Sequence, residues 1–343
     1  MRVKLKKIPV LHLAAVFVLV IMMLFTACSP GDSDAAISTD EIGAETADSS
    51  RDESAGNVDL TESEVPTASV KSGSYEAPPI LLSSFHGKKA TEPRQVEVDT
   101  TALSEGYIAM SAKSAKKLKV QLIKDDQTYT YDISSDGTPS IYPLQLGDGE
   151  YYYRVMENTT GTKYAKIKDD TITVKLKDEF QPFLRPSNYV KFDAKSDTTK
   201  KARELARNAD TQVDVVKAVY DYVTKNVKYD SDKAETIQTQ SDYLPDPDET
   251  LETGKGICFD YASLCAAMLR SQGIPTKLVF GYVAPDDLYH AWNMFYTEET
   301  GWVTVKFEVK KKVWTRLDLT FFAGGAPPDF VGDGSNYEDI YHY

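Results

Sequence analysis

The stretch that decides the fold of this 343-residue chain is Gly254-Lys255-Gly256-Ile257-Cys258-Phe259-Asp260-Tyr261-Ala262, which continues to Gly273-Ile274-Pro275. Glycines in front, a run of good helix formers, and glycine and proline behind predict one helix with Cys258 in its first turn. Unpaired backbone N–H groups and the positive end of the helix dipole favour a thiolate over a thiol at that position. We therefore expect a reactive cysteine at a helix start.

The chain has three cysteines, at positions 28, 258 and 265. They are too few for a disulfide framework or a four-ligand zinc site, and we expect neither a metal nor a cofactor. Cys265 follows Cys258 by seven residues, which places it about 10 Å further along the helix axis, too far for a disulfide bond. Cys265 is expected to be a small buried hydrophobic residue.

A thiolate at a helix start needs a base, and the sequence offers four histidines. His12 lies in an apolar N-terminal segment, His86 follows a polar N-terminal region, and His342 is the penultimate residue, so His290 remains. It stands in residues 288–296, whose apolar and aromatic alternation predicts a strand. A single histidine in a strand is more often structural than catalytic, so its role depends on its neighbours.

Two further strands are predicted downstream, at residues 302–307 and 314–321. The second contains Asp318 among apolar neighbours. From there its carboxylate could hold the His290 imidazole by the nitrogen that does not face the cysteine.

Other polar groups near Cys258 allow more than one interpretation. Asp260 is expected to be a helix-start or packing residue, with a substrate contact as the alternative. The Cys258 backbone N–H is expected to be one oxyanion donor. Gln240 and Tyr243 are candidates for the second.

These motifs, in this order, resemble the bacterial transglutaminase-like superfamily. The resemblance covers roughly residues 187–322 and rests on Gly-x-Cys-x-Asp-Tyr-Ala, Val-x-Gly-Tyr at 279–282, Tyr-His-Ala-Trp at 289–292 and Trp-x-Arg-x-Asp-x-Thr-Phe at 314–321. It implies a papain-like α+β core with Cys258 as nucleophile, His290 as base and acid, and Asp318 as the residue that orients the imidazole. Trp292 and Trp314 could form walls of the cleft.

The transglutaminase-like domain is assigned to residues 183–343, where the pattern becomes helical. Apolar residues recur at steps of three and four between Ala202 and Val227, and Thr211 with Asp214 predicts a capping box. Residues 243–249, which are rich in proline and acid, could be mistaken for a cation site. The prolines and the lack of a glycine-hinged ligand loop argue against calcium there.

Residues 91–182 are expected to form an all-β domain, an immunoglobulin-like sandwich. Apolar residues alternate with period two in segments 118–122, 129–133, 151–155 and 172–176, and turn residues separate them. Leu-Gly-Asp-Gly-Glu-Tyr at 146–151 resembles the tyrosine corner of such domains.

The N-terminal residues predict the cellular location of the protein. Residues 1–27 carry four basic groups and an apolar run, and end in Ala27 before Cys28, which is typical of a signal peptide and resembles the lipobox of bacterial lipoproteins. We expect lipidation at Cys28 and a bacterial cell-surface location, with an ordinary cleaved signal or an uncleaved anchor as alternatives. Residues 28–90 are expected to be a disordered acidic tether, because their composition offers little apolar surface to bury.

The net charge of −13 argues against binding to nucleic acid. The leading hypothesis is thiol acyl transfer on amide bonds of proteins or peptides, either to water, as in a cysteine peptidase or amidase, or to an amine, as in a transglutaminase. Hydrolysis is favoured, because only 31 residues separate Cys258 from His290 and leave no long insertion to close over the site. The alternative is a non-catalytic protein- or cell-wall-binding module on the same scaffold.

Overall fold

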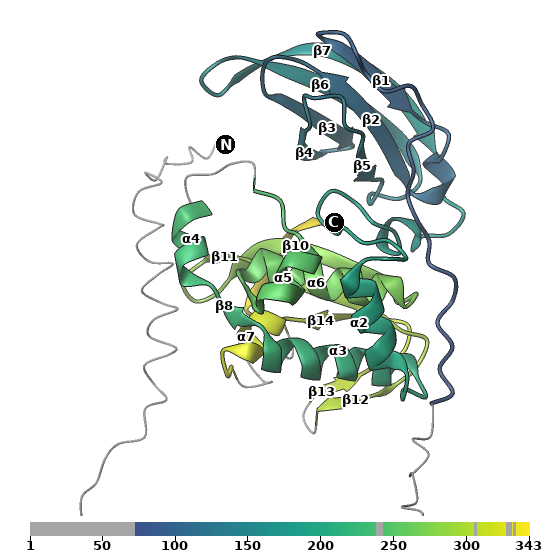
Figure 1. The fold of residues 1–343 in the computed structure, drawn as a ribbon, viewed down its shortest axis with the longest axis vertical. Coiled ribbons are helices and arrows are strands. Elements are labelled where there is room, and N and C mark those ends of the chain that lie inside the picture. The colour runs from purple at the N-terminus through teal and green to yellow at the C-terminus, as the bar shows by residue number, and fades with distance from the viewer. Residues whose placement is uncertain (1–72, 238–242, 305–306, 327–330, 332–333) are drawn as a thin grey trace, which may run out of the picture.

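A computed structural model describes residues 73–237, 243–304, 307–326, 331 and 334–343 of the chain (Figure 1). The expected signal peptide, Cys28 and Gln240 lie outside these residues. A β-rich region comes first, and a core of mixed α and β structure follows it (Figure 1).

The β-rich region consists of two antiparallel sheets. One has the order β1-β2-β5 and the other β4-β3-β6-β7. Their strands are β1 (Gln95–Asp99), β2 (Tyr107–Lys113), β3 (Leu118–Lys124), β4 (Gln127–Ile133), β5 (Ser140–Pro143), β6 (Gly149–Thr160) and β7 (Lys163–Val174). The predicted alternation is confirmed on β3, β4 and β6, where every second side chain is buried.

Tyr151 ties the turn before β6 to the strand that begins there. Its hydroxyl lies 3.0 Å from the carbonyl oxygen of Gly147 and 3.1 Å from that of Leu144. These bonds to the backbone a few residues upstream are the ones that the tyrosine-corner resemblance predicts.

The α/β core is organised around helix α6 (Cys258–Ser271), in which every residue except Phe259 is buried. It packs against a four-stranded antiparallel sheet of order β14-β11-β10-β15. The remaining elements are α2 (Asp197–Ala206), α3 (Gln212–Asn226), β8 (Lys228–Tyr229), α4 (Ser231–Ile237), α5 (Pro247–Thr253), β9 (Lys255–Gly256), β10 (Thr276–Val283), β11 (Leu288–Tyr296), β12 (Gly301–Thr304), β13 (Phe307–Val309), β14 (Trp314–Leu317), α7 (Leu319–Ala323) and β15 (Tyr337–His342), with short 3-10 turns at η1 (Leu103–Glu105) and η2 (Gln181–Phe183).

Two strand predictions in this core need correction. The predicted strand 302–307 is divided between β12 and β13, which pair antiparallel with each other. The predicted strand 314–321 ends at Leu317, because the Asp318 side chain accepts a hydrogen bond from the Phe321 N–H and caps α7. A period-two pattern cannot show where a carboxylate converts a strand into a helix start.

Carboxylates also lie at the starts of other helices. Thr211 and Asp214 form the predicted capping box of α3. In the proline-rich acidic loop, Asp246 caps α5, while Asp248 accepts from the Thr198 N–H at 2.7 Å at the start of α2. Two acidic side chains of this loop are therefore engaged by helix N-termini.

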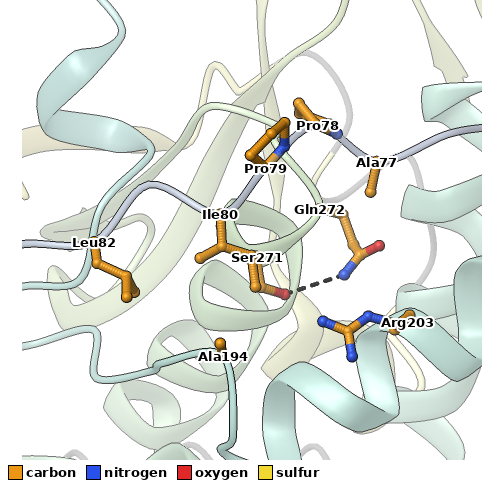
Figure 2. A pocket seen from close by; sticks show the side chains of 9 residues that line it. All are labelled: Ala77, Pro78, Pro79, Ile80, Leu82, Ala194, Arg203, Ser271 and Gln272. Carbon is orange, nitrogen blue, oxygen red and sulfur yellow. Dashed lines mark hydrogen bonds between the residues drawn. The ribbon is translucent and has the colours of Figure 1, made fainter.

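The expected disordered tether is wrong at its C-terminal end, because residues 73–90 form an ordered strap. The strap runs first along the α/β core and then, from Ser84 to Ala90, along β1 and β2 of the β-rich region. The Gly73 and Tyr75 N–H groups donate to the Arg207 and Ala209 carbonyls, both at 2.9 Å. Figure 2 shows the next part, Ala77 to Leu82, passing over Ser271 and Gln272 at a cavity of about 340 Å³. The prediction was based on average composition, which conceals single apolar residues such as Ile80. The Ile80 side chain packs against the hydrophobic core.

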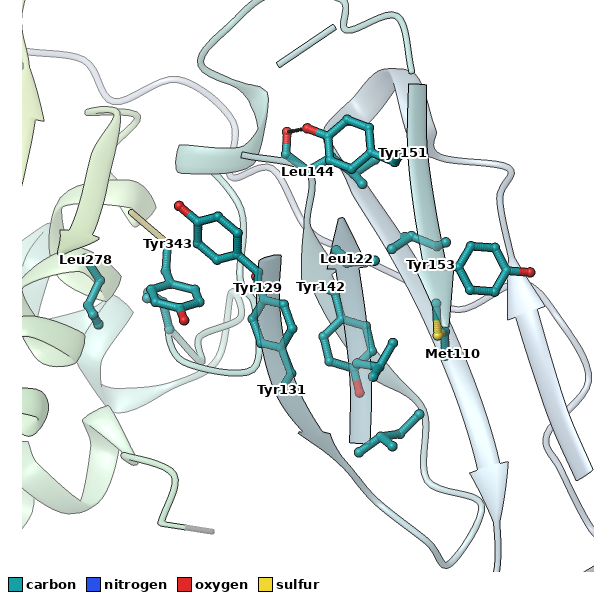
Figure 3. Close-up of a cluster of buried hydrophobic side chains, with 14 of the residues drawn as sticks. Met110, Leu122, Tyr129, Tyr131, Tyr142, Leu144, Tyr151, Tyr153, Leu278 and Tyr343 are labelled. Carbon is teal, nitrogen blue, oxygen red and sulfur yellow. Dashed lines mark hydrogen bonds between the residues drawn. The ribbon is translucent and has the colours of Figure 1, made fainter. Parts of the chain in front are cut away.

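The two regions share a cluster of tyrosines at the end of β15. The Tyr343 ring lies 5.2 Å from that of Tyr129 and 5.6 Å from that of Tyr131, both on β4 (Figure 3). The buried Arg270 guanidinium of α6 donates to the Tyr343 backbone oxygen at 2.9 Å. One hydrophobic core therefore connects the β-rich region to the helix that begins with Cys258.

Within the described ranges, none of the helices combines the length and hydropathy that a bilayer crossing requires.

Candidate active site

Cys258 is the first residue of α6, as the sequence predicts, and is 9% exposed. The preceding Ile257 is extended, with φ −94° and ψ 177°, so the chain turns into the helix directly at the cysteine. Gly256 is required for this turn, because a Cβ there would lie 2.6 Å from Cβ of Asp260. The thiol thus lies where backbone N–H groups of the first turn have no helical partner.

The structure brings His290 and Asp318 together. Nε2 of His290, on β11, lies 2.8 Å from Oδ2 of Asp318, and the two side chains are 3% and 0% exposed. Because Nε2 is engaged by the carboxylate, Nδ1 is the nitrogen left for the Cys258 thiol, which is the imidazole's other hydrogen-bonding neighbour.

The Asp318 carboxylate is fixed by three donors. Besides His290, the Tyr337 hydroxyl donates to Oδ2 at 3.0 Å and the Phe321 N–H donates to Oδ1 at 3.0 Å. Pairing of Asn293 with Leu317 between β11 and β14 brings the carboxylate beside the imidazole. Its orientation is therefore set by the sheet, by α7 and by β15.

The charge of His290 follows from this environment. Burial acts to lower the pKa of His290, but the negative charges of Asp318 and Cys258 outweigh it and raise the pKa to about 10. The raised pKa favours the protonated imidazole at neutral pH. A cation at this place stabilises a thiolate on Cys258.

Cys265 has the inert role that the sequence predicts. It is fully buried and unpaired, and burial raises the pKa of its thiol well above the usual range. It therefore stays a thiol at neutral pH.

Asp260 is confirmed as a helix-start residue. Its Oδ2 accepts from the Ile257 N–H at 2.9 Å, and its Oδ1 accepts from the Tyr243 hydroxyl. The suggestion that Tyr243 is an oxyanion donor is therefore wrong for this arrangement, because its single hydroxyl proton is given to a carboxylate.

Tyr229 is one of the residues near Cys258 that could not be predicted from the sequence. It lies on β8, which pairs parallel with β9 so that Tyr229 is opposite Gly256, two residues before the cysteine. Burial raises the pKa of Tyr229 well above its usual range, and the charges of Cys258 and Asp260 raise it further. The sequence signal was a two-residue strand, which is too short to give a period.

Comparison with known proteins identifies a family for part of the α/β core. Residues 199–307 match the family model described as the transglutaminase-like superfamily. This part of the chain is a transglutaminase-like superfamily domain.

Individual relatives of the transglutaminase-like domain are distant. The uncharacterized protein YebA of Bacillus subtilis (strain 168) is 27% identical over 242 residues, which are 64% of this chain and 31% of YebA. The chain thus spans about a third of the length of that relative.

Two solved structures are similar to this chain at low identity and low TM-score. One is a protein from Cytophaga hutchinsonii, proposed to be a cysteine protease, with 16% identity over 68% of this chain and 73% of that chain and a TM-score of 0.37. The other is red sea bream transglutaminase, with 12% identity over 67% of this chain and 49% of that chain and a TM-score of 0.26.

The two tryptophans predicted to wall a cleft in the transglutaminase-like domain lie in different places. Trp292 is 1% exposed, with its ring centroid 6.1 Å from that of His290, so it supports the imidazole from the protein interior. Trp314 is opposite Tyr296, six residues along β11 from His290, and its ring lies 4.0 Å from Lys277 Nζ. The register therefore excludes Trp314 from the site, which corrects that prediction.

Cavities and metal-binding groups do not add to the site. A second cavity of about 470 Å³ lies between Ser134 and Ser140 of the β-rich region and Leu244. Neither this cavity nor the one under the strap is lined by Cys258 or His290. In the described part of the chain, no group of three His, Cys, Asp or Glu side chains is placed to hold a metal ion.

Proposed function

We propose that the protein is a surface-anchored thiol acyl-transfer enzyme acting on amide bonds of proteins or peptides. The observation that carries the proposal is the buried His290–Asp318 pair at 2.8 Å, with the Cys258 thiol as the second neighbour of the imidazole. Three groups that handle protons and charge have no packing reason to converge in this way. They therefore argue against the alternative of a non-catalytic binding module.

The first half-reaction forms a thioester. The Cys258 thiolate attacks the amide carbonyl, and the Cys258 backbone N–H stabilises the oxyanion. Tyr229, which lies beside Cys258, is the candidate for the second donor. The protonated His290 gives its proton to the departing nitrogen, so that the carbon–nitrogen bond breaks and the amine leaves neutral. Asp318 stabilises the imidazolium before that transfer.

The second half-reaction uses the now neutral His290 as a base. It removes a proton from water or from an amine, which attacks the thioester, and Cys258 leaves as a thiolate. Water gives a carboxylic acid, and an amine gives a new amide. We favour water, because the connection between β10 and β11 is short and a dilute amine must compete with water at about 55 M unless it is positioned.

The proposal also includes a cellular location and a role for the β-rich region. Lipidation at Cys28 would anchor the chain to the bacterial cell surface, and a diacylglyceryl peptide beginning at Cys28 in the membrane fraction would test it. An immunoglobulin-like sandwich for residues 91–182 is supported by two antiparallel sheets and the Tyr151 hydrogen bonds. The β-rich region would then brace α6 through the shared core.

Selective alkylation tests the proposed function. Iodoacetamide at mildly acidic pH should label Cys258, and peptide mass spectrometry should locate the label. Cys258→Ala should abolish that label, whereas the matched variant Cys265→Ala should retain it. His290→Ala should slow the labelling at least about tenfold, because the thiolate loses its counter-charge. Equal labelling of both cysteines in the folded protein argues against the proposal.

A further inference from the structure

A buried carboxylate lies beside the proposed nucleophile. Asp260 is two residues after Cys258 in the first turn of α6 and is 0% exposed. An isolated buried carboxylate is costly, so its partners determine whether it can remain charged.

Lys233 provides the opposite charge. Its Nζ lies 3.0 Å from Oδ2 of Asp260, and its side chain is 21% exposed. The same ammonium lies 4.9 Å from the ring centroid of Tyr243, whose hydroxyl donates to the other Asp260 oxygen. The pair is therefore enclosed on two sides by the segment that precedes α6.

Local structure fixes Lys233 in this position. Asp230 accepts from the Lys233 N–H at 2.9 Å and thus holds the start of α4. The Asp230 N–H donates to the Gly256 carbonyl at 3.0 Å, which attaches the same turn to the residue two before Cys258. Lys233 and Tyr229 consequently approach the start of α6 on one short segment.

The ionisable groups around Cys258 and Asp260 come from four parts of the chain. They are Tyr229 from β8, Asp230 and Lys233 at the start of α4, Tyr243 from the segment before α5, and Tyr289 and His290 from β11. Of these six groups, only Lys233 and His290 carry positive charge. His290 is paired with Asp318, which leaves Lys233 as the partner of Asp260.

We propose that Lys233 is a positioning residue of the candidate active site, which cancels the charge of Asp260 so that Cys258 can carry a thiolate beside it. Two negative charges on one helical turn repel each other, and the repulsion is strong where water is excluded. The Ile257 N–H bond keeps Asp260 at the helix start, so the repulsion can be removed only by a counter-charge. This inference rests on the proposed function.

The test is the pH midpoint of Cys258 alkylation by iodoacetamide, followed by peptide mass spectrometry. Lys233→Met should raise the midpoint by on the order of one pH unit. Lys233→Arg should keep it near the wild-type value, because the charge remains. Lys225→Met removes an exposed lysine of α3 and should leave it unchanged.

A double variant separates charge cancellation from a merely structural role. Lys233→Met with Asp260→Asn removes both charges while keeping an amide oxygen for the Ile257 N–H, so the midpoint should return to near the wild-type value. If Lys233 has only a structural role, the effects of the two substitutions on the midpoint should add. If Lys233→Met does not fold, the double variant and Lys233→Arg still give this comparison.

The outcomes distinguish this inference from the proposed function. If alkylation of Cys258 in the wild-type protein depends on His290 but Lys233→Met leaves the pH midpoint unshifted, this inference is overturned and the proposed function stands. The inference is also overturned if the pH midpoint of the double variant is as high as that of Lys233→Met. A wild-type Cys258 no more reactive than a cysteine in a short peptide overturns the proposed function and this inference with it.

Discussion

The Tyr337 hydroxyl donates to Asp318 Oδ2 at 3.0 Å, and this is the same oxygen that lies 2.8 Å from His290 Nε2. Tyr337 belongs to β15, beyond the residues that match the family model. The last strand of the sheet therefore completes the support of the imidazole.

Tyr337→Phe should lower kcat for amide or ester turnover roughly three- to tenfold with little change in KM, because the carboxylate loses one of three donors. The ring would still pack against Trp292, so the fold should persist. The measurement is steady-state kinetics with circular dichroism as a check on folding. Tyr341→Phe on the same strand is the matched control and should retain wild-type kcat. Equal losses in both variants would show that the sheet, and not the hydroxyl, is responsible.

The raised pKa of His290 makes a prediction about stability. A group whose pKa rises from about 6.5 in the unfolded chain to about 10 in the folded protein stabilises the fold fully below pH 6.5 and loses that effect as pH rises toward 10. His290→Gln should therefore lower the free energy of unfolding by on the order of 1 to 3 kcal/mol at pH 6 and by less at pH 9.5.

Urea denaturation at the two pH values checks this expectation. His342→Gln, at a more exposed site on β15, serves as the control and should show a smaller pH dependence. A destabilisation by His290→Gln that grows with pH would mean that the folded protein holds the imidazole neutral.

The preference for water over amines is a separate prediction. With a glutamine-containing peptide and a labelled primary amine, free acid should exceed the amide product, because the connection between β10 and β11 is short and a dilute amine must compete with water at about 55 M. Chromatographic separation of the two products, with Cys258→Ala as the blank, measures the ratio. Predominant incorporation of the amine would reverse the preference and assign cross-linking activity.

Much of the local structure around the site could be predicted from the sequence. The helix from Cys258 and the strand around His290 are defined by patterns within ten to fifteen residues, which is the range over which periodicity acts. The capping box at Thr211 is equally local.

The rest could not be predicted because it depends on contacts between distant segments. Tyr229 approaches Cys258 through a two-residue parallel pairing, and Tyr337 reaches Asp318 from another strand of the sheet. Trp314 was misplaced because only the register of β14 against β11 shows that it lies beside Tyr296. The ordered strap was missed because a composition average conceals a few apolar residues such as Ile80 that pack against the core.

The central claim, that Cys258 forms a thioester with its substrate, is tested most directly by rapid acid quench and intact-protein mass spectrometry after mixing with an activated ester such as p-nitrophenyl acetate. The account predicts a burst of one acyl group per chain, located on the peptide containing Cys258 and lost with hydroxylamine. The adduct should be absent in Cys258→Ala and present in Cys265→Ala. An acyl group that persists in Cys258→Ala, or no adduct in the folded wild-type protein, would contradict it.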